Sequence, residues 1–551
     1  MRRGILFIFT VLLVLSGYSQ SNKSINRFNE DDANEHFKNK NFVMAIPIYR
    51  NELKKHPFDD KMRFKLAQCL LSTRINREEA ITHLNELLKN NSKYHEAWFE
   101  LGRAYFLTNR LGEAEDAFNE YLKLKPKGED EVNVYKTYIA NARKFMEQPS
   151  NVTFQNLGGQ INSSDPDYYP FTTADESFLA FTSRRQDNVG GKKIEMDGYR
   201  NSDVYFSKID LATGAWEEAK NAGRAINTSL DEQVVGINND GTEIVVYMDH
   251  IDKYGDLYSS ERKDKSADFG RCKLLDPIIN ANIEITGTFN QNNTVFFFAR
   301  KEKIKKNTDL YVCRKLPTGK WSMPLRLPDN INTDKNEDFP YYVEEGSTLY
   351  FASEGHNSMG GYDLYKTTWN IDDNTCTDPE NLGFPINSTD DDRSICVTPD
   401  NRVAYISAFR PGGFGELDIY RIRFNDNEQI NRIVTGQVFF GDTVSKNQPK
   451  ESVATIIASN KKSKEEYTFV PNHKTGRYVI SLPVGEYDLL VSSSGYEKLT
   501  DYMLVSDFGN VEIEKAKNYV LKKTNNSEQA EIEKDKKEAQ KNVQKKSSAK
   551  K

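Results

Sequence analysis

The order of apolar and polar positions divides the chain into a helical part, a strand-rich middle part and a strand-rich end. From residue 27 to residue 147, apolar side chains recur about every three or four positions, which is the spacing of amphipathic α-helices. From residue 151 to residue 425, short alternating or aromatic runs each follow a turn, which predicts β-strands. These runs are SFLAFTS, TEIVVYM, NTVFFFA, STLYFAS and RVAYISA.

The middle part repeats two short motifs at a nearly constant spacing. The first motif is Asp-x-Tyr, and its copies start about 54 residues apart. The second motif is Ile-Asn, usually followed by Ser or Thr, and it begins at Ile161, Ile226, Ile279, Ile331 and Ile386. Two motifs of different chemistry that keep one period indicate an internal repeat. The anchor residues of the first motif are Asp203 and Tyr205, Asp256 and Tyr258, Asp309 and Tyr311, Asp363 and Tyr365, and Asp418 and Tyr420.

Five such units, each with three or four strands, predict a five-bladed β-propeller. The run NVTFQNL at residues 151–157 precedes the first unit, and we expect it to close the ring beside DIYRIRF at residues 418–424. We expect each anchor aspartate to accept hydrogen bonds from backbone N–H groups of a turn. The anchor tyrosines are expected to pack between blades.

The stretch SEGHNSMGGYDLY, residues 353–365, combines a serine, a histidine and glycines. It lacks the G-x-S-x-G pattern of a nucleophile elbow, and a strand rather than a phosphate-loop lysine follows its glycines. The units resemble the PD40 family of TolB-like, WD40-related propellers, as in INSSDPDYYPFTTADESFLAFTS. In that family the stretch is a hairpin within a blade, so we expect no catalytic role for Ser358 or His356.

The first copy of the repeat carries a longer loop than the other copies, from Arg184 to Ser202. Loops that rigid scaffolds position are frequent sites of binding. The loop is therefore either an added binding element or a tolerated surface insertion, and its sequence favours the second interpretation only slightly.

One helical stretch, AWFELGRAYFLTNRLGEAEDAFNEYLKLKP, closely resembles a tetratricopeptide repeat. Small residues at Gly102 and Ala114 would let two antiparallel helices approach. Two weaker copies precede it and a capping helix follows, which together predict an α-helical solenoid of three repeats. The residues that carry the resemblance are Trp98, Leu101, Gly102, Tyr105, Ala114, Phe118 and Pro126.

Stacked helix pairs form a concave groove lined by the first helix of each pair. The repeat phase predicts that a protein partner binds this groove through Phe64, Gln68, Phe99, Arg103 and Phe106. The alternative, in which Phe64 and Phe99 only pack between repeats, is equally compatible with the sequence.

The last strand-rich part, residues 432–523, has no period. Its stretch GRYVISLPVGEYDLLVSSSGY resembles a carboxypeptidase-regulatory-like domain, which implies a small transthyretin-like β-sandwich. Tyr478, Leu482, Tyr487 and Leu489 alternate as its expected core. The sequence H-E-x-x-H of zinc peptidases is absent, so no peptidase activity is implied.

Composition excludes several classes of function. The chain has 75 basic and 81 acidic residues, so a nucleic-acid partner is not expected. Its five cysteines form neither a C-x-x-C motif nor a cluster with histidine, so we expect no zinc site and no cofactor. Buried free thiols are favoured over a Cys376–Cys396 disulfide.

The N-terminus has the features of an export signal. Arg2 and Arg3 precede an apolar run, Gly4–Leu15, that is too short to span a bilayer. Tyr18 stands where a lipoprotein would carry its lipidated cysteine, so no lipid anchor is expected. No later stretch is apolar for the length of a transmembrane helix.

The order of these parts resembles PorE-like periplasmic proteins of the type IX secretion system. The resemblance implies a non-enzymatic scaffold that binds proteins of the cell envelope, in the periplasm and associated with the outer membrane. PorE-like chains continue into an OmpA-like domain that the Lys-rich ending does not resemble, so we expect little peptidoglycan binding. The predicted boundaries are a signal peptide at 1–20, helical repeats at 25–148, a propeller at 151–425, a sandwich at 432–523 and a disordered tail at 524–551.

Two other functions remain open. A propeller that binds a glycan or cell-wall fragment in its central channel would carry polar and aromatic side chains at the channel mouth, whereas a scaffold would carry apolar patches. A hydrolase is the least favoured class, because the sequence offers no separate catalytic domain.

Overall fold

The structure is a computed structural model that divides into two units, at Asp426 and Asn427. The predicted signal peptide and the tail from residue 525 lie outside the described residues. Among the helices of the described residues, none combines the length and the apolar character that a membrane span requires. The described ranges are 27–191, 194–210, 213–252, 254–290, 292–302, 305–426, 432–441, 453–505 and 514–524.

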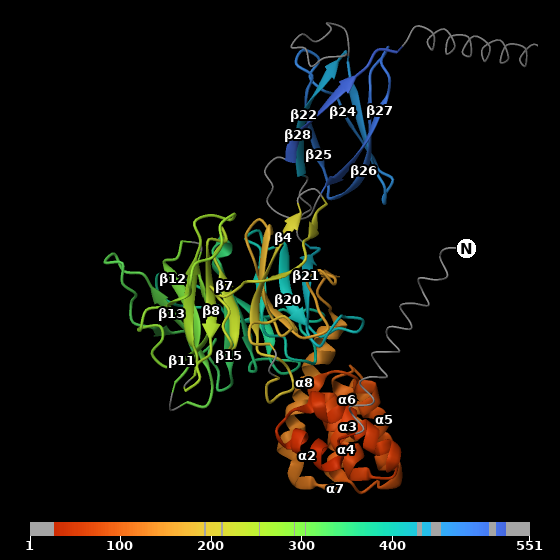
Figure 1. The fold of residues 1–551 in the computed structure, drawn as a ribbon, viewed down its shortest axis with the longest axis vertical. Helices are drawn as coiled ribbons and strands as arrows, with labels where there is room; N and C mark the ends of the chain where they lie inside the picture. Colours follow the sequence, from red (N-terminus) through yellow and green to blue (C-terminus); the bar gives the residue numbers. More distant parts are fainter. Residues whose placement is uncertain are drawn as a thin grey trace, which may run out of the picture. The chain divides into compact units, whose positions relative to one another are not determined.

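The first unit begins with helices that pack as successive antiparallel pairs (Figure 1). Side chains of Asn29, Asn41, Asp59 and Asn76 accept hydrogen bonds from the first turns of four of these helices, which fixes where each helix starts. A Cβ atom at Gly102 would lie 2.7 Å from the Phe118 ring, so this crossing requires the glycine. The helices are α2 (Glu30–Lys38), α3 (Phe42–Lys55), α4 (Asp60–Thr73), α5 (Arg77–Asn90), α6 (His95–Phe106), α7 (Leu111–Leu124) and α8 (Glu129–Glu147), with a 3-10 turn at Pro126–Gly128.

Sheets that each contain one copy of the repeat follow the helices. The first sheet contains β2 (Asp167–Thr172), β3 (Phe178–Ser183), β4 (Asp203–Asp210), β5 (Ala215–Trp216) and β6 (Lys220–Asn221), and the second contains β7 (Glu232–Ile237), β8 (Glu243–Met248), β9 (Asp256–Glu261) and β10 (Lys273–Leu274). The third sheet contains β11 (Ile283–Phe289), β12 (Val295–Lys301), β13 (Asp309–Arg314) and β14 (Leu325–Arg326), and the fourth contains β15 (Glu337–Val343), β16 (Thr348–Ser353), β17 (Asp363–Thr368) and β18 (Glu380–Asn381). The fifth sheet contains β19 (Ile395–Val397), β20 (Val403–Ala408) and β21 (Asp418–Phe424). A short 3-10 turn, Glu345–Ser347, links β15 to β16.

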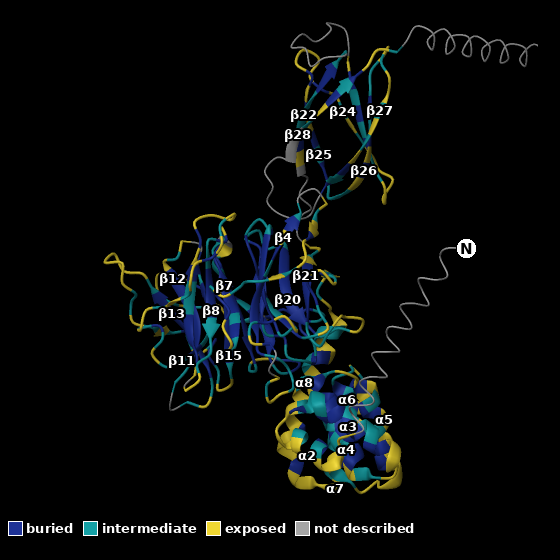
Figure 2. Cartoon of the chain, viewed as in Figure 1, coloured by how far each residue is buried: buried dark blue, intermediate teal, exposed yellow. Residues whose placement is uncertain are grey.

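The first strands of these sheets contact one another in a cycle, β2 to β7, β11, β15, β19 and back to β2. Strand β1 (Val152–Asn156) pairs antiparallel with β21, so the start of the repeated part lies beside its end, as predicted. Each Asp-x-Tyr motif begins the third strand of its sheet. The strands of the sheets are largely buried (Figure 2). This arrangement is propeller-like.

The anchor aspartates hold the loops in front of their strands. Three of them accept backbone N–H groups as predicted, and each also accepts the side-chain amide of an asparagine. Asn156, one of these asparagines, comes from β1. The contacts are Asp203 with Val189 N (2.6 Å) and Asn221 (2.7 Å), Asp363 with Met359 N (2.9 Å) and Asn381 (2.7 Å), and Asp418 with Phe414 N (2.7 Å) and Asn156 (2.9 Å).

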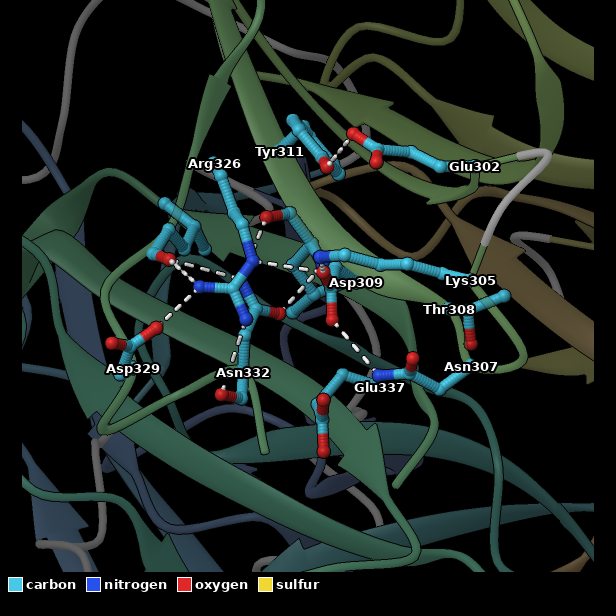
Figure 3. A network of polar contacts seen from close by, with 12 residues as sticks. Glu302, Lys305, Asn307, Thr308, Asp309, Tyr311, Arg326, Asp329, Asn332 and Glu337 are labelled. Carbon is cyan, nitrogen blue, oxygen red and sulfur yellow. Dashed lines mark hydrogen bonds and ion pairs between the residues drawn. The ribbon is translucent and has the colours of Figure 1, made fainter. Parts of the chain in front are cut away.

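Two anchors use charged or ionisable side chains. At Asp309 the donors recorded among the described residues are side chains, chiefly Lys305 Nζ at 2.5 Å and Arg326 Nε at 2.8 Å, so the prediction of backbone donors is wrong there (Figure 3). His250 Nε2 lies 3.1 Å from Asp256. Tyr311 and Tyr365 are buried in clusters that join neighbouring sheets, as predicted, whereas Tyr258 is half-buried.

The asparagine of every Ile-Asn motif holds the residue that follows an anchor aspartate. Its Oδ1 accepts the backbone N–H of that residue and its Nδ2 donates to the same residue's carbonyl oxygen, at 2.7–3.1 Å. Asn162 joins the first repeat to the last strand, because its partner is Ile419. The pairs are Asn162–Ile419, Asn227–Val204, Asn280–Leu257, Asn332–Leu310 and Asn387–Leu364.

Replacing Asn162 with alanine is expected to lower the free energy of unfolding by about 2 kcal/mol, because the buried N–H of Ile419 loses its acceptor, whereas the Ile419 carbonyl oxygen keeps Leu157 N as a donor. Chemical denaturation followed by fluorescence measures the change. Asn119→Ala, at an exposed position on α7, is the matched control and should change stability little. Equal stability of the two variants would contradict this role for the repeated asparagine.

The stretch Ser353–Tyr365 is the connection between β16 and β17, as predicted. The Ser358 hydroxyl donates to the carbonyl oxygen of Gly361 at 2.9 Å, and His356 Nε2 lies 3.1 Å from the Ile331 carbonyl oxygen. Burial lowers the pKa of His356. Both side chains are occupied in loop contacts.

The second unit has two sheets around one core. The predicted core residues Tyr478, Leu482, Tyr487 and Leu489 are all buried. One sheet contains β22 (Arg432–Phe440), β25 (Arg477–Leu482) and β28 (Glu514–Leu521), and the other contains β23 (Thr455–Asn460), β24 (Glu466–Phe469), β26 (Gly485–Ser492) and β27 (Leu499–Val505).

All five cysteines are free. Cys69, Cys313 and Cys396 are buried, while Cys272 and Cys376 are partly exposed. The favoured prediction of free thiols therefore agrees with the structure, and the Cys376–Cys396 disulfide does not form.

Candidate functional site

Two of the predicted groove residues lie on α4. Phe64 is half-buried and packs against Tyr94, with ring centroids 5.0 Å apart. Gln68 donates a hydrogen bond to Glu100 at 3.1 Å, and Glu100 forms an ion pair with Arg103 at 2.8 Å. The structure therefore brings Gln68 and Arg103 together through one carboxylate, and both remain half-exposed.

Helix α8 covers the other predicted groove residues. Phe106 is only 2% exposed and lies 5.5 Å from the Tyr135 ring of α8, so the prediction that Phe106 faces a partner is wrong. Phe99 is half-buried and contacts the rings of Phe118, Tyr121 and Tyr135, which agrees with the packing alternative. The face of α6 that carries both phenylalanines is filled by the protein's own capping helix.

A buried cluster of charges joins the helices to the sheets of the first unit. Arg74 contacts Asp390 at 3.2 Å and Glu416 at 3.0 Å. Arg77, only 8% exposed, donates to Asp390 at 2.8 Å. Burial alone would raise the pKa of Asp390, but the charges of Arg77 and Arg74 hold this pKa below its ordinary value. The carboxylate is therefore ionised and is shared by two guanidinium groups, while Glu416 supplies a second negative charge to Arg74.

An apolar contact lies beside this cluster. Met359, from the glycine-rich hairpin, is fully buried among side chains of α6, α7 and α8. The Asn141 side chain donates to the Ser358 carbonyl oxygen at 2.8 Å, and Ser150 N donates to the Phe384 carbonyl oxygen at 2.7 Å. The Ser353–Tyr365 connection is thus a docking element for the helices.

The long loop of the first sheet also reaches the helices. Arg184 forms a two-pronged ion pair with Asp197, at 2.6 and 3.1 Å. The Tyr199 hydroxyl donates a short hydrogen bond to Glu416. A Cβ atom at Gly198 would collide with the side-chain oxygen of Asn41, so the loop lies directly against the start of α3. The described residues of the loop therefore lie against the helical part, a placement that neither of the two sequence interpretations predicted.

A cavity of about 300 Å³ lies where the loop, the helices and the first strands meet. This size is at the lower end of small-molecule sites, which hold roughly 300–1,000 Å³. Its lining is polar and aromatic. The lining residues are Arg74, Arg184 and Arg393; Asp197, Asp391 and Glu416; Tyr168, Tyr169 and Tyr199; and Pro166, Gln233, Ser407 and Leu417.

Three of these residues occupy equivalent places in the repeat. Tyr168, Gln233 and Arg393 each follow the acidic residue that starts or precedes the first strand of a sheet. Ile285 and Asp338 hold the same place in the other two sheets. The sequence motifs did not single out these positions, although a residue that directly follows a repeated acidic position is a signal that could have found them.

The repeated acidic residues are buried and hold the Ile-Asn turns. Glu337 accepts hydrogen bonds from Thr333 N at 2.9 Å and from the Thr333 hydroxyl at 2.7 Å. Burial raises the pKa of Glu337 to about 7 and that of Glu232 to about 8, above the ordinary 4.5. The folded chain therefore binds these protons more tightly than the unfolded chain does.

Stability is accordingly expected to depend on pH. Because the pKa values of Glu337 and Glu232 are higher in the folded chain than in the unfolded chain, the two carboxyl groups contribute their full stabilisation below about pH 4.5. This contribution is lost as the pH rises to about 8. The melting temperature should fall from about pH 5 to about pH 8, and should fall less in Glu337→Gln. Thermal denaturation across this range measures both slopes. An unchanged slope in the variant would contradict the assignment.

No group of His, Cys, Asp and Glu side chains in the described ranges could hold a metal ion. The chemistry that the cavity offers is hydrogen bonding and aromatic contact.

Comparison with known proteins identifies one part of the chain. Residues 76–129 match the tetratricopeptide repeat family. No curated protein sequence matches the chain. The helical part is therefore a tetratricopeptide-like region, followed by a large β-rich part with several sheets.

Solved structures with similar folds are distant. A putative TolB from Agrobacterium tumefaciens is 14% identical at a TM-score of 0.27, over 50% of this protein and 99% of that one. A sucrose-6-phosphate hydrolase from Lactobacillus gasseri is 10% identical at 0.33, over 68% and 94%. An alpha-L-arabinofuranosidase from Lactobacillus brevis is 13% identical at 0.30, over 47% and 90%. At these scores the similarities carry no argument about function.

Proposed function

We propose that the protein is an exported, non-enzymatic scaffold of the cell envelope in which tetratricopeptide repeats are mounted on a five-bladed propeller. A carboxypeptidase-regulatory-like sandwich follows the propeller in this proposal. The order of parts supports a role in a type IX secretion assembly, in the periplasm and associated with the outer membrane. Its partners would be proteins.

The observation that carries this proposal is the way the helices are held. The family match of residues 76–129 is to a repeat that stacks into concave surfaces, and such surfaces bind proteins. The Arg74–Asp390–Arg77 cluster and buried Met359 fasten the repeats to the sheets. A fixed solenoid with Phe64, Gln68 and Arg103 half-exposed is suited to holding a partner in one orientation.

Crosslinking in intact cells of the source organism, followed by purification of the protein, tests this proposal. The protein is expected in the envelope fraction, bound to one or more protein partners. Recovery in the cytosolic fraction, with no crosslinked partner, would contradict it.

One observation favours a second function, ligand binding in the cavity of about 300 Å³. The cavity is concave, and three tyrosines and a glutamine line it beside three arginine–carboxylate pairs; convergent aromatic and polar side chains of this kind support ligand binding. This function does not exclude the first.

A further inference from the structure

We propose that the cavity between the helices and the first strands binds a neutral saccharide of one or two rings. The inference rests on the second proposed function, ligand binding at this site, and names the class of ligand. It requires that the cavity prefers neutral ligands, that it offers an aromatic face, and that its hydrogen-bond donors and acceptors suit sugar hydroxyls.

Charge pairing argues for a neutral ligand. Each arginine of the lining already faces a carboxylate: Arg184 lies 2.6 Å from Asp197, Arg74 lies 3.0 Å from Glu416, and Arg393 lies 3.1 Å from Asp391. An anionic ligand would have to displace one of these carboxylates and leave it unpaired in a partly buried place, which is unfavourable. A phosphate or an acidic sugar is therefore disfavoured.

Tyrosine rings supply the aromatic face. Tyr168 and Tyr169 lie edge to face, with ring centroids 4.6 Å apart, and Tyr199 enters from the loop. Tyr169 has a φ of 54° and lies at an irregularity in the β2–β3 register; Phe339 has a φ of 49° at the equivalent place in β15, so this backbone conformation belongs to the repeat and places the Tyr169 ring beside Tyr168. The C–H face of a pyranose ring packs well against a tyrosine ring, whose face carries partial negative charge.

The polar groups suit hydroxyls better than a peptide. Paired guanidinium and carboxylate groups present donors and acceptors side by side, and neighbouring sugar hydroxyls need both. Gln233 and Ser407 add an amide and a hydroxyl. Of the described residues that line the cavity, only Pro166 and Leu417 are aliphatic, too few to form the apolar pockets that give a peptide its affinity.

Calorimetric titration of the full-length protein with millimolar cellobiose and N,N′-diacetylchitobiose tests the proposal. Galacturonic acid serves as the acidic probe and trialanine as the peptide probe. At least one neutral disaccharide should bind more tightly than both of these. Gln233→Ala should weaken that binding about tenfold, the effect of losing one well-placed hydrogen bond.

Ile285→Ala is the matched control, because Ile285 holds the equivalent place in β11 but lies outside the cavity. It should change the affinity less than twofold, roughly the error of the measurement. If trialanine or galacturonic acid binds more tightly and depends on Gln233, the cavity is a ligand site and the saccharide inference is wrong. If no probe binds, or both variants weaken binding equally, both the inference and the second proposed function fail.

Discussion

Asp390→Ala is expected to lower the free energy of unfolding by about 3–5 kcal/mol and to uncouple the helices from the sheets. The reason is that Arg74 and Arg77, with side chains 20% and 8% exposed, would stay buried without their shared carboxylate. Removing one partner of a buried ion pair costs far more than removing an exposed pair, which is worth about 0–1 kcal/mol.

Urea denaturation of the full-length protein, followed by far-ultraviolet circular dichroism and by tryptophan fluorescence, measures this effect. Both the Asp390→Ala protein and the protein that keeps Asp390 carry Trp98→Phe, which removes the tryptophan of α6. Circular dichroism then reports mainly on the helices, while Trp216, Trp321 and Trp369 report on the sheets. We expect the two transitions to separate further in Asp390→Ala than in the protein that keeps Asp390. Asp372→Ala, at an exposed position near the end of β17, is the control and should leave both transitions unchanged. Unchanged transitions in Asp390→Ala would refute the fastening role of the cluster.

Phe106→Ala is the second substitution with a large expected effect, again about 3–5 kcal/mol. Phe106 is 2% exposed and its ring contacts Tyr135 and Tyr138, so truncation opens a cavity between α6 and α8. The same denaturation experiment, monitored by circular dichroism, gives the value.

Phe58→Ala is the matched control for that substitution, because Phe58 is 87% exposed between α3 and α4. It is expected to change stability little. A Phe106→Ala protein that keeps its stability but loses a protein partner would show that Phe106 faces the partner after all, and would overturn the packing assignment.

Short-range regularities in the sequence predicted much of the fold. The third strand of each repeated sheet starts at its anchor aspartate, and the predicted closing run pairs with Asp418–Phe424. These features could be predicted because repeated backbone geometry requires the same residue type at the same place in every unit.

The junction could not be predicted in this way. Arg74 and Glu416 meet only in the folded protein, and neither stands in a repeated motif. The phase of the tetratricopeptide repeat correctly placed Phe99 and Phe106 on one face of α6. It does not determine whether a partner or the protein's own α8 covers that face. The cavity was missed for a related reason, since Tyr168, Gln233 and Arg393 share a place in the repeat but no residue type.

The central claim, that the helical repeats hold a protein partner, is tested most directly by a photo-crosslinking amino acid placed at Gln68 in living cells. Gln68 is half-exposed on α4, and Glu113, exposed on α7, is the control position. The proposal predicts a discrete crosslinked protein from position 68 in the envelope fraction and none from position 113. No adduct at position 68, or the same adducts from both positions, would contradict it.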